Sequence, residues 1–143
     1  MEVEKFFGSS YNGTKSFSQQ QVVTANATGF GAAADDYAER GIDLNEQLIR
    51  NKPATFFMRV SGNSMINAGI YDGDIVIVDR SLKPQNGKIV IAVIDGEMLI
   101  RRYEKTMNSL RLIPETAKLS PIEVNEFSDF SVWGVVTYVI HAV

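Results

Sequence analysis

The sequence predicts a mainly β fold: a compact domain of short, largely antiparallel strands, preceded by a mobile N-terminal arm and short helices. From residue 55 onward, short segments rich in Val and Ile alternate with turn residues, as is typical of a small antiparallel β domain. Residues 93–98, VIDGEM, contain a two-residue Asp-Gly turn, which is the strongest local indication of a hairpin. With 143 residues, the chain is long enough for one domain with a sizeable core.

The composition predicts a flexible arm over residues 1–28 and a folded domain over residues 29–143. Residues 8–28 are rich in Gly, Ser, Gln, Asn and Thr, and their apolar residues follow neither a helical nor a strand period. Such a segment buries too little apolar surface to offset its ordering entropy.

Two short helices are expected at the start of the folded domain. Residues 33–41, AADDYAERG, predict a helix that Gly41 closes. Asp43 and Glu46 form a pair resembling a capping box, which indicates a second helix, and Pro53 follows its expected end.

Short strands make up the rest of the predicted domain. Turn residues such as Asp72-Gly73-Asp74 and Asp95-Gly96 separate them. The expected strands are 55–60, 75–79, 88–94, 97–103, 109–113 and 132–140.

Composition also excludes several classes of function. A net charge of −3 argues against a protein that grips nucleic acid by charge alone, so no direct sequence-specific DNA binding is expected. The absence of cysteine and the single histidine exclude thiol catalysis, thiolate metal sites and His-rich metal sites. The longest apolar runs, IVIV and IVIAVI, are too short to span a bilayer, and MEVEKFFGSS lacks the apolar core of a secretory signal. We therefore expect a cytoplasmic protein without membrane anchor, metal or cofactor.

The candidate reactive residue is Ser64, in the stretch SGNSM that follows a predicted strand. A serine hydroxyl becomes a nucleophile only when a neighbouring group takes its proton. The plainer interpretation of Ser61 and Ser64 is a tight turn whose hydroxyls bond the backbone. Asp72 and Asp74 likewise have the pattern of Asx-type turn residues, not of metal ligands.

Four segments, SGNSM, GIYDGDIVIVD, GKIVIAVIDGEMLIRR and RLIPE, follow one another in this order. Together they resemble the LexA/UmuD family of self-cleaving serine–lysine peptidases. The segments TGFGAAADDYAERGIDLNEQLI and ATFFMRVSGNSM resemble its UmuD branch in particular. The resemblance covers roughly residues 28 to 143 and implies a LexA/UmuD-type, signal-peptidase-like β domain. A short polar arm stands where LexA carries a DNA-binding domain.

The resemblance also implies roles for individual residues. Ser64 occupies the position of the nucleophile, and the backbone N–H groups of Ser64 and Met65 are the expected oxyanion donors. The scissile bond is expected between Thr28 and Gly29. The implied partners are a second copy of the chain, a RecA filament on single-stranded DNA and a UmuC-like translesion polymerase, with the sliding clamp as a further candidate. The apolar residues of FSVWGVVTYVI then serve the core, the dimer surface or both.

The sequence departs from the family at the general base. Arg101 stands at the position of the family's lysine, and Arg102 follows it, so a shift of the alignment by one residue does not recover a lysine. A buried lysine can lose its charge, whereas the guanidinium of an arginine stays protonated in proteins. Thr28 is a second departure, because the family favours Ala or Cys before the scissile glycine, and threonine is bulkier and stiffer.

Two residues are candidates for a replacement base. If the Asp95-Gly96 turn pairs residue 90 with residue 101, Lys88 lies opposite Tyr103 and diagonal to Arg101, at ~7–8 Å between backbones. His141 is the other candidate, but no feature of the sequence brings it near Ser64. The plainer interpretation is a solvated side chain in both cases.

Two hypotheses of function follow, and the sequence leaves both open. In one, Ser64 cuts the chain's own arm with Lys88 or another group as base. In the other, the same fold is a dimeric accessory subunit of an error-prone polymerase without peptidase activity, with Arg101 either natural or introduced to trap the uncut form. A leader-peptidase-like hydrolase of other proteins is a weaker third hypothesis, because the lysine and the membrane anchor are absent.

Overall fold

The computed structural model describes residues 2–7 and 41–143. The chain divides into two compact units, one formed by Met1–Asn12 with Asn51–Val143 and the other by Gly13–Arg50. The candidate residues Thr28 and Gly29, and the helix predicted over 33–41, lie outside the described residues.

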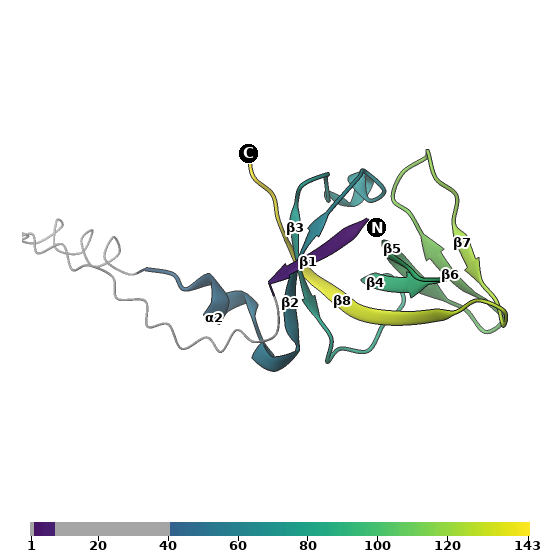
Figure 1. Ribbon diagram of the computed structural model, residues 1–143, viewed down its shortest axis with the longest axis horizontal. Coiled ribbons are helices and arrows are strands. Elements are labelled where there is room, and N and C mark those ends of the chain that lie inside the picture. Colours follow the sequence, from purple (N-terminus) through teal and green to yellow (C-terminus); the bar gives the residue numbers. More distant parts are fainter. Residues whose placement is uncertain (1, 8–40) are drawn as a thin grey trace, which may run out of the picture. The chain divides into compact units, whose positions relative to one another are not determined.

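The first unit contains one antiparallel sheet of eight strands, which curls around its own core (Figure 1). The order across the sheet is β1-β2-β3-β8-β4-β5-β6-β7. The strands are β1 (Val3–Phe7), β2 (Thr55–Val60), β3 (Ile75–Asp79), β4 (Ile89–Ile94), β5 (Glu97–Lys105), β6 (Leu110–Ile113), β7 (Ile122–Val124) and β8 (Phe130–Ile140). Two short 3-10 helices, Lys52–Ala54 and Ile66–Ala68, lie in the same unit.

The six predicted strands are all present, and every pairing is antiparallel. The predicted mainly β fold is therefore confirmed. Residues 90 and 101 are partners, and the Tyr103 N–H donates to the carbonyl of Lys88, so the predicted hairpin register is also correct. Strand β1 and the three-residue strand β7 were not predicted.

Strand β1 corrects the expectation of an arm without regular structure at residues 3–7. Val3 pairs with Val60 and Glu4 with Arg59, so the strand extends the sheet at the edge of β2. Backbone pairing and the burial of Val3 order this short segment, although its sequence carries no turn signal that marks it as a strand.

Strand β8 joins the two halves of the sheet. Its last residues, 135–140, pair with β3, and its first residues, 130–135, pair with β4. The register shifts once along each pairing. A β-bulge bends a strand and increases its twist. These shifts therefore allow one long strand to serve both halves.

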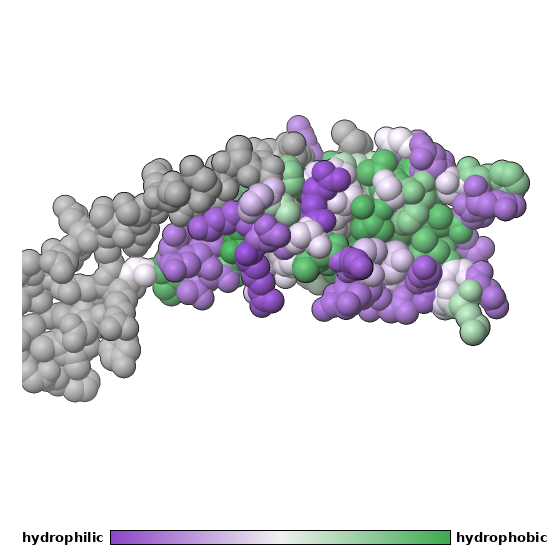
Figure 2. Space-filling view, turned by 90° about the horizontal axis from the view of Figure 1, so that it is seen from below, coloured by the Kyte–Doolittle hydropathy of each residue, from purple (hydrophilic) through white to green (hydrophobic). Residues whose placement is uncertain are grey.

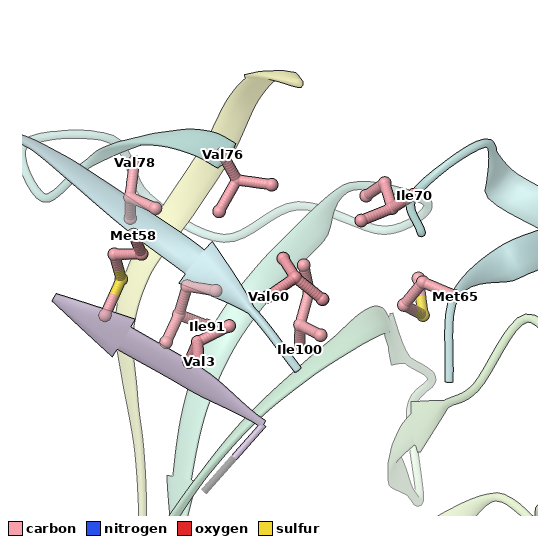
Figure 3. Close-up of a cluster of buried hydrophobic side chains, with 9 residues drawn as sticks. All are labelled: Val3, Met58, Val60, Met65, Ile70, Val76, Val78, Ile91 and Ile100. Carbon is pink, nitrogen blue, oxygen red and sulfur yellow. The ribbon is translucent and has the colours of Figure 1, made fainter. Parts of the chain in front are cut away.

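The core has two clusters, which lie on opposite faces of β4 and β5 because side chains alternate along a strand. The first, shown in Figure 3, contains Val3, Met58, Val60, Met65, Ile70, Val76, Val78, Ile91 and Ile100. The second contains Val90, Ala92, Ile94, Leu99, Tyr103, Leu112 and Val135. The turn that carries Met65 and Ile70 thus packs into the first cluster (Figure 3), which fixes the position of Ser64 beside Met65.

In the second unit, the described residues form the short helix α2 (Leu44–Leu48). Asp43 is its N-cap, and its carboxylate accepts a hydrogen bond from the Asn45 N–H at 2.9 Å. The helix predicted after Asp43 is therefore confirmed. The bond from the cap goes to Asn45 and not to Glu46, the partner expected in a capping box.

Across residues 2–7 and 41–143, no helix has the length and apolar character needed to cross a membrane.

Candidate functional site at Ser64 and Arg101

Ser64 lies in the connection between β2 and β3 and is 5% exposed. The connection is held from several sides. Gly62 adopts a left-handed conformation with φ of 91°, and its N–H donates to Asp72 Oδ1 at 2.7 Å. The carbonyl of Ser64 accepts a hydrogen bond from the Glu115 N–H at 2.8 Å. The serine is therefore fixed by the backbone on both sides of its side chain.

The hydroxyl of Ser64 donates to Glu2 Oε1 at 2.8 Å. The same carboxylate binds Arg101, whose Nη1 lies 2.5 Å from Oε1 and 2.7 Å from Oε2. Ser64 and Arg101 thus meet at the site, as the resemblance implied, but a carboxylate lies between them. Glu2 was not among the predicted site residues.

Strand β1 brings Glu2 to this position. The residue precedes Val3, the first residue of the strand, and its main chain bonds two other elements. Its N–H donates to the Met98 carbonyl at 3.2 Å, and its own carbonyl accepts from the Ser61 N–H at 2.6 Å. Glu2 therefore joins the serine turn to β5 by its main chain as well as by its carboxylate.

Arg101 projects from β5 opposite Val90, and its side chain is 6% exposed. A charge this buried is costly unless it is paired. Nη1 donates to the carboxylate of Glu2 and to the Ile100 carbonyl. Among the described residues, the buried Nε has no hydrogen-bond acceptor.

This arrangement binds an anion well and supplies no lysine base. Both buried side chains donate hydrogen bonds to one carboxylate, and an arginine in a protein cannot take a proton from a serine. The only acceptor that the structure places on the Ser64 hydroxyl, within the described part of the chain, is Glu2.

The backbone N–H groups of Ser64 and Met65 are the oxyanion donors that the resemblance implies. Among residues 2–7 and 41–143, neither the N–H of Ser64 nor that of Met65 has a hydrogen-bond partner. By contrast, the N–H of Ser61 is engaged by Glu2. Ser61 thus joins the turn to Glu2 through its backbone N–H.

The two candidate replacement bases lie elsewhere. Lys88 is exposed, and its carbonyl accepts the Tyr103 N–H. His141 Nδ1 lies 2.6 Å from Asp74 Oδ1, and its ring lies beside that of Tyr71. The Ser64 hydroxyl therefore bonds Glu2, and neither Lys88 nor His141 is among its described partners.

Asp72 and Asp74 serve as turn residues, as predicted. Asp72 Oδ1 accepts the Gly62 N–H, and Asp74 Oδ2 accepts the Tyr71 N–H at 2.8 Å. The described ranges contain no group of three or more His, Cys, Asp or Glu residues that could hold a metal ion.

The fold and the site together define a peptidase-like β domain in which a buried serine and a buried arginine bind one carboxylate. The family model described as "Peptidase S24-like" matches residues 21–137, and the chain belongs to this family, which includes LexA and UmuD. The segments SGNSM and GKIVIAVIDGEMLIRR, on which the resemblance was recognised, lie inside the matched range.

Individual relatives agree with this assignment. The chain is 44% identical over 117 residues to the protein ImpA of Salmonella typhimurium, a match that covers 79% of this chain and 77% of ImpA. It is 41% identical over 115 residues to the protein SamA of Salmonella typhimurium, covering 79% and 78%. It is 38% identical over 109 residues to LexA repressor 1 of Xanthomonas campestris, covering 76% of this chain and 54% of the repressor.

Proposed function

We propose that the chain is a UmuD-like protein of the SOS response: a homodimeric accessory subunit of an error-prone translesion polymerase that does not cleave its own arm. The similarity to ImpA and SamA over most of each chain supports the UmuD branch. On this proposal the protein acts in the cytoplasm, and its partners are a UmuC-like polymerase, a RecA filament on single-stranded DNA and, as a further candidate, the sliding clamp.

One observation supports a non-cleaving subunit over a peptidase. The residue at the lysine position is Arg101, and its guanidinium is paired with Glu2. Self-cleavage in the family requires a neutral amine that takes the proton of the serine. A paired guanidinium cannot do this, so on this proposal the protein acts by binding its partners and not by cleavage.

The end of β8 supports the proposed homodimer. Tyr138, Val139 and Ile140 are 38%, 39% and 42% exposed, whereas Val135 is buried. In the described sheet, residues 136–140 pair only with β3, so the other edge of this half of β8 is open. An open strand edge with apolar side chains is a ready site for pairing with a second copy.

Copurification with the polymerase tests the accessory role. The chain and a UmuC-like polymerase should be coexpressed, and the complex isolated by an affinity tag on the polymerase. We expect a stable complex with two copies of the uncut chain, measured by native mass spectrometry. Failure of the uncut chain to join the polymerase, under conditions where a lysine-bearing relative joins it after cleavage, would refute the proposal.

Cleavage by another base is the competing function, and the hydrogen bond from Ser64 to Glu2 is the observation in its favour. A carboxylate that accepts a hydrogen bond from a serine can also accept its proton. The pairing of Glu2 with Arg101 opposes this role, because both oxygens of the carboxylate already accept hydrogen bonds from the guanidinium. If the wild-type chain loses residues 1–28 and this loss depends on Glu2, cleavage with Glu2 as the base is established.

A further inference from the structure

We propose that Arg101 and Ser64 form a carboxylate-binding pocket, and that Glu2 is its resident ligand and anchors strand β1 across the former peptidase centre. The ligand class of the pocket is an extended peptide with an acidic side chain. This site does not depend on the polymerase role proposed above.

The contacts of Arg101 and Ser64 with the Glu2 carboxylate are those of a preformed anion-binding site. Arg101 and Ser64 are each 5% exposed, and both donate to the same carboxylate. Hydrogen bonds between ionised partners are roughly twice as strong as neutral ones. An empty pocket would leave the guanidinium buried without a counter-charge, so the pocket requires an anion.

The main chain around the pocket also binds the backbone of Glu2, so the site recognises an extended strand as well as a charge. Glu2 donates to the Met98 carbonyl and accepts from the Ser61 N–H, and β1 then continues along the edge of β2. This is the mode by which extended peptides add to an exposed sheet edge, with main-chain bonds for affinity and one pocket for specificity. Here the specific pocket selects a carboxylate.

Strand β1 needs such an anchor. It lies at the edge of the sheet, and its register to β2 shifts between Lys5 and Phe7. Val3 is buried in the first core cluster, beside Ile91 in Figure 3, whereas Glu4 is exposed. Short edge strands open easily, and the Glu2 contacts hold the end of this one.

Arginine suits this role because its guanidinium keeps its charge when it is buried. Its planar guanidinium offers five donors, and Nη1 alone contacts both oxygens of Glu2. The unpartnered Nε shows that the pocket, as far as the structure describes it, retains a donor that Glu2 does not use. A second acceptor on a peptide ligand could use that donor.

The anchor also has a consequence for catalysis. A carboxylate beside an amine favours the charged form of the amine. With Glu2 in the pocket, a lysine at position 101 would therefore stay protonated and would not act as a base. Restoration of the family's lysine alone is then insufficient to restore cleavage.

Hydrogen exchange on the full chain tests the anchor. Glu2→Gln keeps the shape of the side chain and removes its charge, and Glu4→Gln makes the same change at an exposed position of the same strand. We expect the backbone amides of Val3–Phe7 to exchange at least about tenfold faster in Glu2→Gln, since hydrogen bonds to charged groups are the strong ones. Glu4→Gln should stay close to the wild type. Equal exchange in all three proteins would overturn the proposal.

Acetate binding tests the ligand class. In Glu2→Ala the pocket lacks its resident carboxylate, so acetate should cause saturable changes in the NMR signals of Arg101 and Ser64. Wild type and Glu4→Ala should show no such change, and sodium chloride at equal ionic strength controls for screening. No saturation in folded Glu2→Ala, or the same response in wild type, would contradict a carboxylate-binding pocket.

Discussion

At the scale of single residues, Arg101 and Glu2 decide the chemistry of the site. The guanidinium is buried and the side chain of Glu2 is 21% exposed, and their carboxylate–guanidinium pair accepts the hydrogen bond of the Ser64 hydroxyl at Glu2 Oε1. Catalysis by the family's mechanism would need a neutral group in the place of Arg101. The same residues are well arranged to hold a peptide carboxylate.

Gly134 is a residue whose identity the fold requires. A Cβ at this position would lie 2.5 Å from Val78 Cγ1 and 3.4 Å from the Asp79 carbonyl oxygen. Val78 is fully buried and cannot move aside without disturbing the core. A side chain at position 134 is therefore excluded by packing and not by backbone conformation.

We predict that Gly134→Ala destabilises the protein by about 1–3 kcal/mol, the usual cost of overpacking a core. The free energy of unfolding is measured by urea denaturation. Ser131→Ala, at an exposed position of the same strand, is the control and should change stability by less than about 0.5 kcal/mol. Equal stability of the two variants would show that β8 can shift away from β3.

At the scale of elements, the hairpin of β4 and β5 was predictable and strand β1 was not. The Asp95-Gly96 turn is a local signal, and it set the register that places Arg101 opposite Val90. The short segment VEKFF carries no comparable signal. Its strand exists because the open edge of β2 offers backbone partners and the core accepts Val3.

The turn of this hairpin gives the second prediction. Asp95 and Gly96 have φ of 50° and 83°, and a Cβ on Gly96 would meet nothing within 4 Å. Gly96→Ala should therefore lower the free energy of unfolding through backbone strain alone, by about 1–2 kcal/mol. Asp95→Asn, which tolerates the left-handed region, should be nearly neutral. Thermal unfolding of both variants checks this, and a neutral Gly96→Ala would mean that the turn changes type.

The candidate site was predictable only where a local sequence motif marks its residues. Ser64 and Arg101 were identified because they lie in recognisable motifs. Glu2 is 62 residues from Ser64 and 99 residues from Arg101, and no local pattern reports a contact over that separation. A buried arginine needs a counter-charge, and this requirement was the one signal that an unidentified carboxylate was needed.

At the scale of the whole molecule, the surface indicates where interfaces can form. Figure 2 shows one face on which apolar side chains gather among hydrophilic ones. Separately, the end of β8 exposes Tyr138, Val139 and Ile140, which the sequence analysis could not assign to core or dimer surface. The structure assigns Val135 to the core and leaves these three residues accessible in the single chain.

The proposed dimer leads to the third prediction. Val139→Asp introduces a charge at the open edge of β8 and should weaken dimerisation at least about tenfold, because an unpaired buried charge is costly. Sedimentation velocity over a concentration series measures the dissociation constant. Leu82→Asp makes the same kind of change at another exposed position and should leave the dimer intact. Dimerisation unaffected by Val139→Asp would place the interface elsewhere.

The most direct test of the central claim is the intact mass of four proteins after incubation with RecA, ATP and single-stranded DNA. They are the wild type, Glu2→Gln, Arg101→Lys and the double variant that carries both changes, with Ser64→Ala added to the double variant as control. We expect only the double variant to lose residues 1–28 rapidly, because only there is a lysine free of a neighbouring carboxylate. Cleavage of the wild type that requires Ser64 would contradict the account. Equal cleavage of Arg101→Lys and the double variant would contradict the part assigned to Glu2.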